Sequence, residues 1–419
     1  MLNAKGQREL AYVAEITDVR PIEGYDRVEL VVVNNGWTCV VGKGQFKLGD
    51  PAIYFEIDSK LPEKPPFSDN EFIVKKKYKI QTQKMCKSIS QGLIMSAEDF
   101  GWQHFNEVEN RRKQPVVREY RIGILDDEHV PHYADDESKF LTEKLGVTYA
   151  VKEDNFRKSN RDNKYARMAK HHPKIAQTWW WRKLYKSNAG KKFLFAIFGK
   201  ATKKTDWPDW VKKTDEERIQ NMPWILSDKE PWIVTEKIDG TSTTFSVHKK
   251  KHSKDYDFYV CSRNVVFDSD EKQCYYDENY YTAMAKKYDV KKALTDFAKK
   301  GNYEWVTLQG ETFGANIQKR DYSLKEQEFF AFNLITDREG RWNSVDAEKA
   351  MKPYNIYWVP ILDTNFVLPA TLDEMLAYAD GESVLDHGMR EGVVLRSQDG
   401  TKSFKAVSNA YLLNKSGRN

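Results

Sequence analysis

A lysine, an aspartate and a glycine lie close together in Lys237-Ile238-Asp239-Gly240, soon after the apolar segment Trp232-Ile233-Val234. A lysine amine is a nucleophile once it has lost its proton, and carboxylates are hard oxygen ligands for divalent cations. The Lys-x-Asp-Gly spacing alone is a weak signal, because ordinary residue frequencies give about 0.1 chance matches in a chain of this length. A surface lysine in a hairpin turn is the alternative interpretation.

Further charged and aromatic groups follow this lysine in a fixed order. They are Ser262-Arg263-Asn264, Leu308-Gln309-Gly310-Glu311, Phe329-Phe330-Ala331-Phe332-Asn333, Arg390-Glu391-Gly392-Val393-Val394-Leu395-Arg396 and Lys402-Ser403-Phe404-Lys405. With the lysine segment first, the order resembles motifs I, Ia, III, IIIa, IV and V of the covalent nucleotidyltransferase superfamily, which contains ligases and capping enzymes. The resemblance covers residues 233–408.

The elements ahead of these motifs predict a small β-barrel over residues 1–104. Short β-rich segments alternate there with Gly, Pro and Asn turns, which suits an OB-like barrel, although an SH3-like barrel leaves much the same pattern. Lysines between residues 75 and 87 either line a groove for nucleic-acid backbone or form a charged loop. The predicted strands are Leu10–Ile16, Val28–Val33, Trp37–Val41, Ala52–Ile57 and Gly92–Met95.

Residues 105–212 read as a connecting region with a basic insert. From Lys152 to Lys204 the chain has 16 Lys and Arg residues but only three acidic residues, a local net charge of +13 in a chain of +5. Such a surface favours a polyanionic partner, and aromatics among the cations, as in Trp179-Trp180-Trp181, suit RNA contact. Packing of these rings on the domain beneath, a solvated basic face and a membrane-surface helix are the alternatives.

Residues 213–419 alternate strands with helices, which predicts an α+β domain with antiparallel sheets. Thr214-Asp215-Glu216-Glu217 has the form of a capping box, so we expect a helix that begins there and carries Arg218. The predicted strands are Thr243–Val247, Tyr259–Ser262, Val306–Gly310, Phe329–Ile335 and Val393–Arg396, and the predicted helices are Tyr280–Tyr288, Val290–Lys300, Ser344–Lys352 and Leu372–Ala379.

The position of the barrel narrows the resemblance. A barrel ahead of the motifs and the segment 214–221 are similar to Deinococcus/Naegleria-type ATP-dependent RNA ligases, which place an OB domain before the nucleotidyltransferase domain. DNA ligases and capping enzymes carry an OB domain after motif V, and the 14 residues beyond Lys405 leave no room for one. The resemblance implies an enzyme that joins RNA 3′-hydroxyl and 5′-phosphate ends in RNA repair.

The resemblance also implies the order of the chemistry. Lys237 attacks the α-phosphorus of ATP, forms lysyl-AMP and releases pyrophosphate. The AMP then passes to the 5′-phosphate of RNA, and the neighbouring 3′-hydroxyl expels it. Because only a neutral amine attacks, the lysine pKa must fall well below its reference of about 10.4. Positioning and charge neutralisation should dominate each transfer.

The matched motifs assign roles to individual residues. Three carboxylates resemble those that hold a hydrated Mg²⁺ or Mn²⁺ on the α-phosphate, although acidic residues at loop ends are the plain alternative. Arg263 is expected on the ribose or a phosphate, Phe332 stacked on adenine or packed in a strand core, and Glu236 near the adenine. The catalytic set is Lys237, Asp239, Glu311, Glu391 and Lys405, the metal set Asp239, Glu311 and Glu391, and the nucleotide set Glu236, Lys237, Arg218, Arg263, Glu311, Phe332, Lys402 and Lys405.

The last motif departs from the family pattern, and the basic insert between about 151 and 205 is longer than the resemblance leads us to expect. Relatives have a second lysine two residues after the one matched by Lys405, where this chain has Val407, and Lys402 is the nearest substitute. Arg218 is assigned to the β- and γ-phosphates or their metal. Its alternative is an exposed ion pair with Asp215 on the expected helix.

Composition indicates the class of protein and the environment in which it acts. The chain is 40% apolar and 31% charged, with a mean hydropathy of −0.72. The first ten residues lack the apolar core of a secretory signal, the longest apolar run is too short to span a bilayer, and four cysteines without CxxC spacing argue against disulfides and a zinc site. We therefore expect a cytoplasmic monomer that does not contact a membrane.

The expected partner is RNA, as a nicked duplex or an RNA/DNA hybrid among other arrangements. Two alternative functions remain open at this point. One is a noncatalytic nucleic-acid-binding protein with a degenerate transferase domain. The other is a GTP-dependent guanylyltransferase of the capping type.

Overall fold

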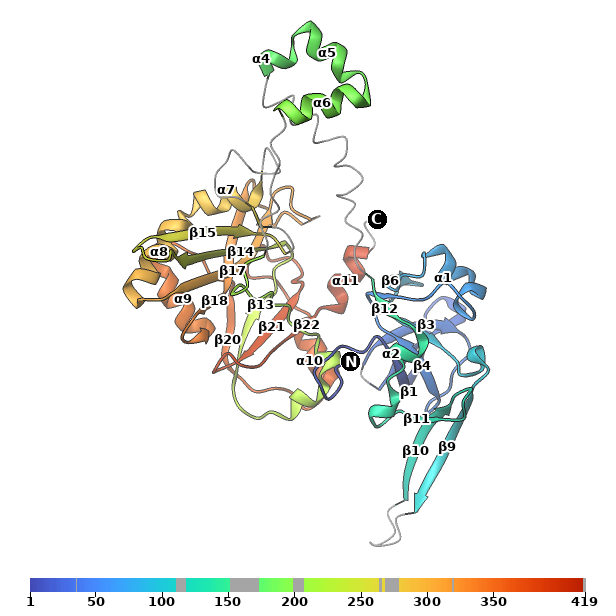
Figure 1. The fold of residues 1–419 in the computed structure, drawn as a ribbon. Helices are drawn as coiled ribbons and strands as arrows, with labels where there is room; N and C mark the ends of the chain where they lie inside the picture. Colours follow the sequence, from blue (N-terminus) through green and yellow to red (C-terminus); the bar gives the residue numbers. More distant parts are fainter. Residues whose placement is uncertain are drawn as a thin grey trace.

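The computed structural model describes most of the chain as two domains side by side with a small helical module above them (Figure 1). In the part that it describes, no helix is long and apolar enough to cross a membrane. The residues described are 1–419 apart from 35, 111–117, 151–172, 199–206, 264–265, 268–278, 319 and 417–419, with only the backbone for 106–110, 118–120, 173–174 and 415–416.

The N-terminal domain is a nearly closed barrel built on an antiparallel sheet in the order β3-β2-β1-β4-β8. A bulge between Ile16 and Asp18 bends β1, so that its first half pairs with β4 and its second half with β2. All five predicted strands are confirmed. They are β1 (Ala11–Ile22), β2 (Tyr25–Val33), β3 (Thr38–Gly42), β4 (Pro51–Phe55) and β8 (Leu93–Met95).

Successive residues of β1 face opposite sides of the barrel sheet, and both sides are buried. Tyr12 packs in one core, while Val13 packs in a second core that includes Ile124 of the later sheet β11-β10-β9. The other elements of this domain are β5 (Ser59–Lys60), α1 (Glu71–Lys75), β6 (Thr82–Met85), β7 (Ser88–Gln91), β9 (Gln103–Asn110), β10 (Arg118–Leu125), β11 (Pro131–Tyr133), α2 (Thr142–Leu145) and β12 (Thr148–Tyr149).

The C-terminal domain contains two antiparallel sheets, one of four strands in the order β20-β13-β21-β22 and one of six in the order β16-β15-β14-β17-β18-β19. Helices pack against both sheets (Figure 1). The strands are β13 (Trp232–Glu236), β14 (Thr241–Lys249), β15 (Tyr256–Cys261), β16 (Val266–Phe267), β17 (Trp305–Gly314), β18 (Gln327–Thr336), β19 (Gly340–Arg341), β20 (Ile361–Phe366), β21 (Gly392–Ser397) and β22 (Ser403–Val407). The helices are α7 (Tyr280–Lys287), α8 (Val290–Gly301), α9 (Ser344–Met351), α10 (Leu372–Ala379) and α11 (Asn409–Ser416).

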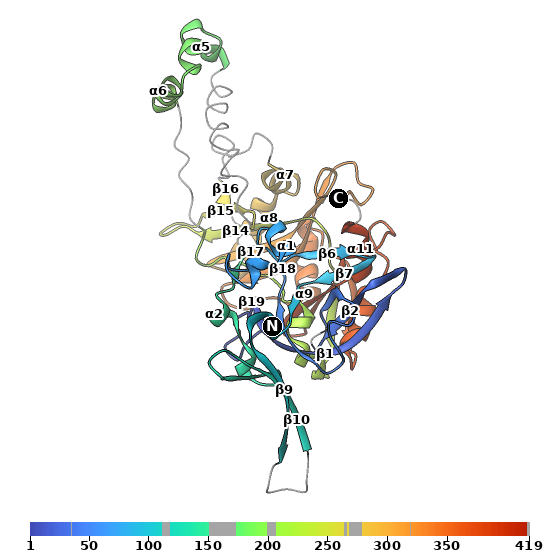
Figure 2. The same cartoon turned by 90° about the vertical axis from the view of Figure 1, so that its right-hand side faces the viewer.

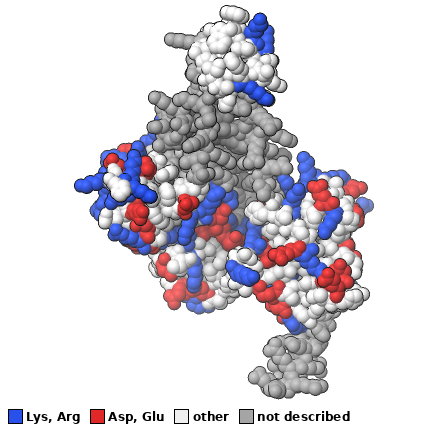
Figure 3. All heavy atoms as spheres, viewed as in Figure 1, with Lys and Arg blue, Asp and Glu red and all other residues white. Residues whose placement is uncertain are grey.

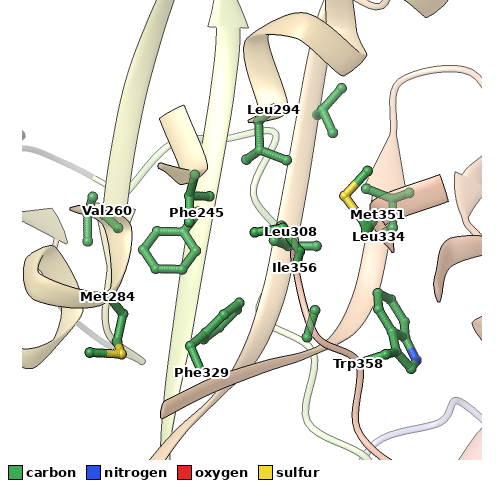
Figure 4. Close-up of a cluster of buried hydrophobic side chains, with 14 of the residues drawn as sticks. Phe245, Val260, Met284, Leu294, Leu308, Phe329, Leu334, Met351, Ile356 and Trp358 are labelled. Carbon is green, nitrogen blue, oxygen red and sulfur yellow. The ribbon is translucent and has the colours of Figure 1, made fainter. Parts of the chain in front are cut away.

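The largest core of the domain lies against the six-stranded sheet. The rings of Phe245 on β14 and Phe329 on β18 meet edge to face at 5.0 Å (Figure 4). Leu294 of α8 and Met351 of α9 are fully buried against the same sheet. The predicted α+β class and the four predicted helices of this domain are therefore confirmed.

The predicted helix at Thr214 is wrong, because residues 211–217 have no helical hydrogen bonds and only a short 3₁₀ turn, Ile219–Asn221, follows. The Thr214 hydroxyl, which would have capped the helix, donates to Gln309 Oε1 at 2.5 Å. The Glu216 carboxylate binds the guanidinium groups of Arg341 and Arg396 at 3.2 and 3.1 Å. These long-range contacts use the groups on which a local helix start depends.

Candidate active site

The predicted catalytic residues converge where the two sheets of the C-terminal domain meet. Lys237 directly follows β13, and its backbone N–H donates to Gly392 O at 3.0 Å, which places the lysine beside Glu391 at the start of β21. Lys405 lies on the next strand, β22. The other sheet supplies Glu311 from β17, facing the turn that contains Asp239. Residues separated by up to 168 positions thus form one cluster.

A glycine allows the lysine turn to approach β17 this closely. A Cβ atom at Gly240 would lie 2.4 Å from Thr312 O and 2.9 Å from the side chain of Glu311. Any larger residue would therefore push the turn away from the strand. The glycine of Lys-x-Asp-Gly is needed for contact between the two halves of the site.

The amine of Lys237 is held as an ammonium in this structure. Its Nζ donates to Glu391 Oε2 at 2.7 Å. Burial pushes the lysine pKa down, but the charges of Glu391, Glu311 and Asp239 outweigh it and raise the pKa above its ordinary value. The amine is therefore protonated at neutral pH, and attack requires a change in its surroundings.

Two further groups of the cluster have pKa values near 8. Burial raises the pKa of Glu311 to about 8, with added repulsion from Glu391 and Asp239. Burial lowers the pKa of Lys405 to about 8, and the neighbouring charges of Lys237 and Arg218 lower it further. Burial is the main cause of both pKa shifts, and repulsion from like charges in the cluster adds to each of them.

Arg218 belongs to the same cluster and does not pair with Asp215. The extended segment around it forms a parallel bridge with Lys405, and its guanidinium lies 5.5 Å from the ring of Trp37 in the barrel. Its Nη1 is buried without a hydrogen-bond partner among the described residues. Burial, the largest influence, lowers its pKa. A buried cation with a spare donor is suited to an anion.

Sequence reasoning missed two tyrosines that hold Asp239. The hydroxyl of Tyr411 on α11 donates to Asp239 Oδ2 at 2.6 Å, and the backbone N–H of Asp239 donates to the hydroxyl of Tyr322 at 2.7 Å. The guanidinium of Arg320 lies over the Tyr322 ring at 4.1 Å. Tyr322 and Tyr411 are 83 and 172 positions from Asp239 in the chain, so no local sequence pattern connects either tyrosine to it.

Two other predicted nucleotide contacts flank the cluster. Glu236 is buried, and its carboxylate accepts hydrogen bonds from Ser383 Oγ at 2.6 Å and Val384 N at 2.9 Å, which ties β13 to the loop before Glu391. Phe332 is the extra residue of a bulge in β18, where the register against β17 shifts. A bulge re-aims its side chain, and the half-buried ring lies 5.9 Å from the Arg396 guanidinium.

The remaining two predicted contacts have ion partners outside the lysine cluster. Arg263 pairs with Asp215 at 2.5 Å, and both side chains are more than half exposed. Lys402 pairs with Asp228 at 2.7 Å and lines a cavity of about 720 Å³ with Trp224. Neither of these ion pairs involves Lys237, Glu311 or Glu391.

The three predicted metal ligands surround the Lys237 ammonium. No group of three or more His, Cys, Asp and Glu side chains among the described residues is arranged to hold a metal ion. The ammonium supplies the positive charge between Glu391 and its neighbours instead. The oxygen donor set suits Mg²⁺ or Mn²⁺, and the raised pKa of Glu311 shows that more positive charge is favourable there.

The fold and this cluster define a nucleotidyltransferase-type ligase, and comparisons with known proteins agree. A family model for RNA ligase matches residues 230–407, and an OB-fold domain model matches residues 10–97. Among the curated proteins there is no match.

Solved structures match over nearly the whole chain. Naegleria gruberi RNA ligase with PPi is 26% identical with a TM-score of 0.62, covering 97% of this chain and 99% of that one. Mutants of that enzyme with AMP and Mn and with ATP and Mn are each 25% identical over the same shares, with TM-scores of 0.62 and 0.61. The chain thus carries an RNA ligase domain preceded by an OB-fold domain, and the comparisons support an RNA-ligating enzyme.

Proposed function

We propose that this RNA ligase uses ATP and joins RNA 3′-hydroxyl and 5′-phosphate ends through lysyl-AMP and RNA-adenylate intermediates. The observation that carries the proposal is the position of one partly buried amine, Lys237, among carboxylates and two further cations, Arg218 and Lys405. A nucleophile beside an unneutralised pair of cations suits attack on a phosphate.

Each residue of the cluster has a part in that chemistry. Lys237 forms a bond to the α-phosphorus of ATP as the bond to pyrophosphate breaks, and its proton leaves before the attack. Arg218 offers its spare Nη1 donor to the phosphates. Lys405 neutralises charge on the α-phosphate in this step and again when AMP passes to the RNA 5′-phosphate. Phe332 provides an aromatic face for adenine.

Asp239, Glu311 and Glu391 would hold a divalent cation, Mg²⁺ or Mn²⁺, which supplies charge neutralisation at the phosphates when bound. The carboxylates also act on the lysine, because Glu391 must release the ammonium for it to become a neutral amine. The solved Naegleria gruberi enzymes that resemble this chain contain ATP, AMP, PPi and Mn, which supports nucleotide and metal use here.

We assign the chain to RNA repair as a cytoplasmic monomer that acts on RNA, with a nicked RNA duplex and an RNA/DNA hybrid as the first substrates to test. A panel of matched nicked duplexes with RNA or DNA on each side of the nick distinguishes these substrates. Sealing of the duplex with RNA on both sides of the nick is the expected result.

Covalent labelling tests the proposal directly. Incubation with α-labelled ATP and Mg²⁺ or Mn²⁺ should label the protein, and Lys237→Ala should abolish the label. Lys249→Ala, an exposed lysine at the far end of β14, is the matched control and should keep it. Retained labelling of Lys237→Ala, or an adduct mapped to another side chain by mass spectrometry, would remove the assignment. Preference for GTP over ATP would favour a capping-type enzyme.

A further inference from the structure

The helical module between the two domains in sequence has a composition unlike the rest of the chain. It comprises α4 (Pro173–Ala176), α5 (Trp179–Tyr185) and α6 (Asn188–Phe198), and stands apart from both domains in two perpendicular views (Figures 1 and 2). Figure 3 shows basic but no acidic side chains on its visible face. Its sequence has no Asp or Glu and contains Lys174, Arg182, Lys183, Lys186, Lys191 and Lys192.

The module builds a core of its own, which uses two of its three adjacent tryptophans. Trp181 is 2% exposed and packs with Leu194, and the rings of Trp180 and Phe198 join them. Gly190 lets α6 approach α5, since a Cβ there would lie 1.9 Å from Leu184 O. Two of the three rings therefore pack within the module, and the alternative interpretation, in which they pack on the domain beneath, is not what the structure shows.

The third tryptophan is not part of that core. Trp179 is 75% exposed. Arg182, Lys183 and Lys186 follow it at spacings of three, four and seven residues, and all three are exposed. Residues at these spacings lie on one face of a helix. An exposed indole is therefore flanked by three cations, and no carboxylate of the module neutralises them.

We propose that this face of α5, formed by Trp179, Arg182, Lys183 and Lys186, binds single-stranded RNA. A base stacks on the Trp179 ring, and the three cations bind successive phosphates of the backbone. Stacking is tolerant of base identity and the phosphate contacts carry no sequence information, so the face grips a strand without selecting its sequence. This surface is separate from the Lys237 cluster and adds a second RNA contact to the ligase.

The charge of the module favours RNA as its partner over a lipid surface or another protein. The module also exposes Phe193 and Ile197 on α6, which are 56% exposed each and could meet a lipid surface or another protein. These apolar residues lie on a different helix from the tryptophan face. The three cations lie on the same face of α5 as the exposed aromatic ring, and this combination of an aromatic with cations is the one that proteins use to bind single-stranded nucleic acid.

The test uses the full chain, EDTA and no ATP, so that binding is measured without ligation. The probe is a fluorescein-labelled 12-nucleotide single-stranded RNA of mixed sequence, and the readout is anisotropy. Trp179→Ala should weaken binding about tenfold, within the range of one lost stacking contact, and Trp179→Phe should restore most of the affinity. Replacing Arg182, Lys183 and Lys186 together by Gln should lower the slope of log K against log salt by about 2, at about 0.7 per single-strand phosphate contact.

Replacing Lys291, Lys299 and Lys300, which are exposed on α8, together by Gln is the matched control and should leave affinity and slope unchanged. An affinity of Trp179→Ala within twofold of the parent protein overturns the proposal, as does an equal loss in the α8 variant. Binding to phosphatidylcholine–phosphatidylserine vesicles that Phe193→Ser/Ile197→Ser removes, with no effect of either α5 variant on RNA affinity, would assign the module to membranes.

This inference rests on RNA as the substrate but not on the lysyl-AMP chemistry. The α5 variants should retain covalent labelling with ATP, and in sealing assays their KM for RNA should rise with little change in kcat. Loss of labelling in the parent protein would remove the proposed reaction and leave the RNA-binding result intact.

Discussion

The ion pair between Lys237 and Glu391 should shift the ammonium–amine equilibrium of Lys237, the proposed nucleophile, toward the ammonium in the nucleotide-free protein. The Nζ to Oε2 distance is 2.7 Å, and a unit charge pair at that distance contributes about 1.5 kcal/mol even with the dielectric constant of water. That energy corresponds to about tenfold in the ammonium–amine equilibrium. Glu391→Gln should therefore raise the neutral fraction of Lys237 at least about tenfold at a given pH in the nucleotide-free protein.

Competitive labelling measures this fraction residue by residue. Trace acetic anhydride modifies neutral amines, and mass spectrometry of the Lys237 peptide across pH 7 to 12 gives its titration curve. In Glu391→Gln the curve should move to lower pH. Glu382→Gln, which removes an exposed carboxylate hydrogen-bonded to His387 on the preceding loop, should leave it in place. An unchanged curve, or one moved to higher pH, would refute the reasoning that Glu391 holds the ammonium.

Three more measurements test the rest of the cluster. Sulfate, whose charge is constant in this range, should bind the nucleotide-free protein less tightly as pH rises through about 8, because Lys405 loses its positive charge and Glu311 becomes negative there; calorimetry should show a weaker dependence in Lys405→Gln, with the part due to Glu311 remaining. Tyr411→Phe removes the hydroxyl bound to Asp239, a contact of the class worth about 1.5–3 kcal/mol, so single-turnover lysyl-AMP formation should fall about tenfold while RNA affinity stays constant. Glu216→Ala leaves the guanidinium of Arg396, which is 3% exposed, without its carboxylate; urea denaturation should show about 3–5 kcal/mol less stability, and a loss below about 1 kcal/mol would contradict a buried ion pair.

Local sequence patterns predicted most of the strands and helices correctly. The structure around Thr214 and Asp239 depends instead on contacts between residues far apart in the chain. Alternating apolar residues and Gly or Asn turns place the barrel strands correctly, since those signals depend on nearby residues alone. Thr214 carries an equally good local signal for a helix, yet its hydroxyl binds Gln309, 95 residues away, and Glu216 binds Arg396, 180 residues away. Tertiary contacts override the weak preference of a short segment. Tyr322 and Tyr411, which hold Asp239, could not be found from the sequence because they too are distant from it in the chain.

The N-terminal domain contacts segments of the site, and its own sequence does not predict these contacts. Arg218 lies between Trp37 of the barrel and Lys405 of the ligase domain. On the other side of the cluster, Lys84 of β6 donates to Leu413 O of α11, the helix that also carries Tyr411. The barrel therefore touches the segments that position both a cation and a carboxylate of the site.

These contacts explain why so many like charges can be kept together without a ligand. Repulsion among Lys237, Arg218 and Lys405 contributes to the low pKa of Lys405, and repulsion among the carboxylates contributes to the high pKa of Glu311. Separating the groups would relieve both, but the barrel and α11 hold the segments in place. In the proposed function, Arg218 and Lys405 would hold the phosphates and the three carboxylates would hold the divalent cation, which would supply neutralising charge to both halves of the site. Binding of nucleotide and cation together should therefore be more favourable than binding of either alone.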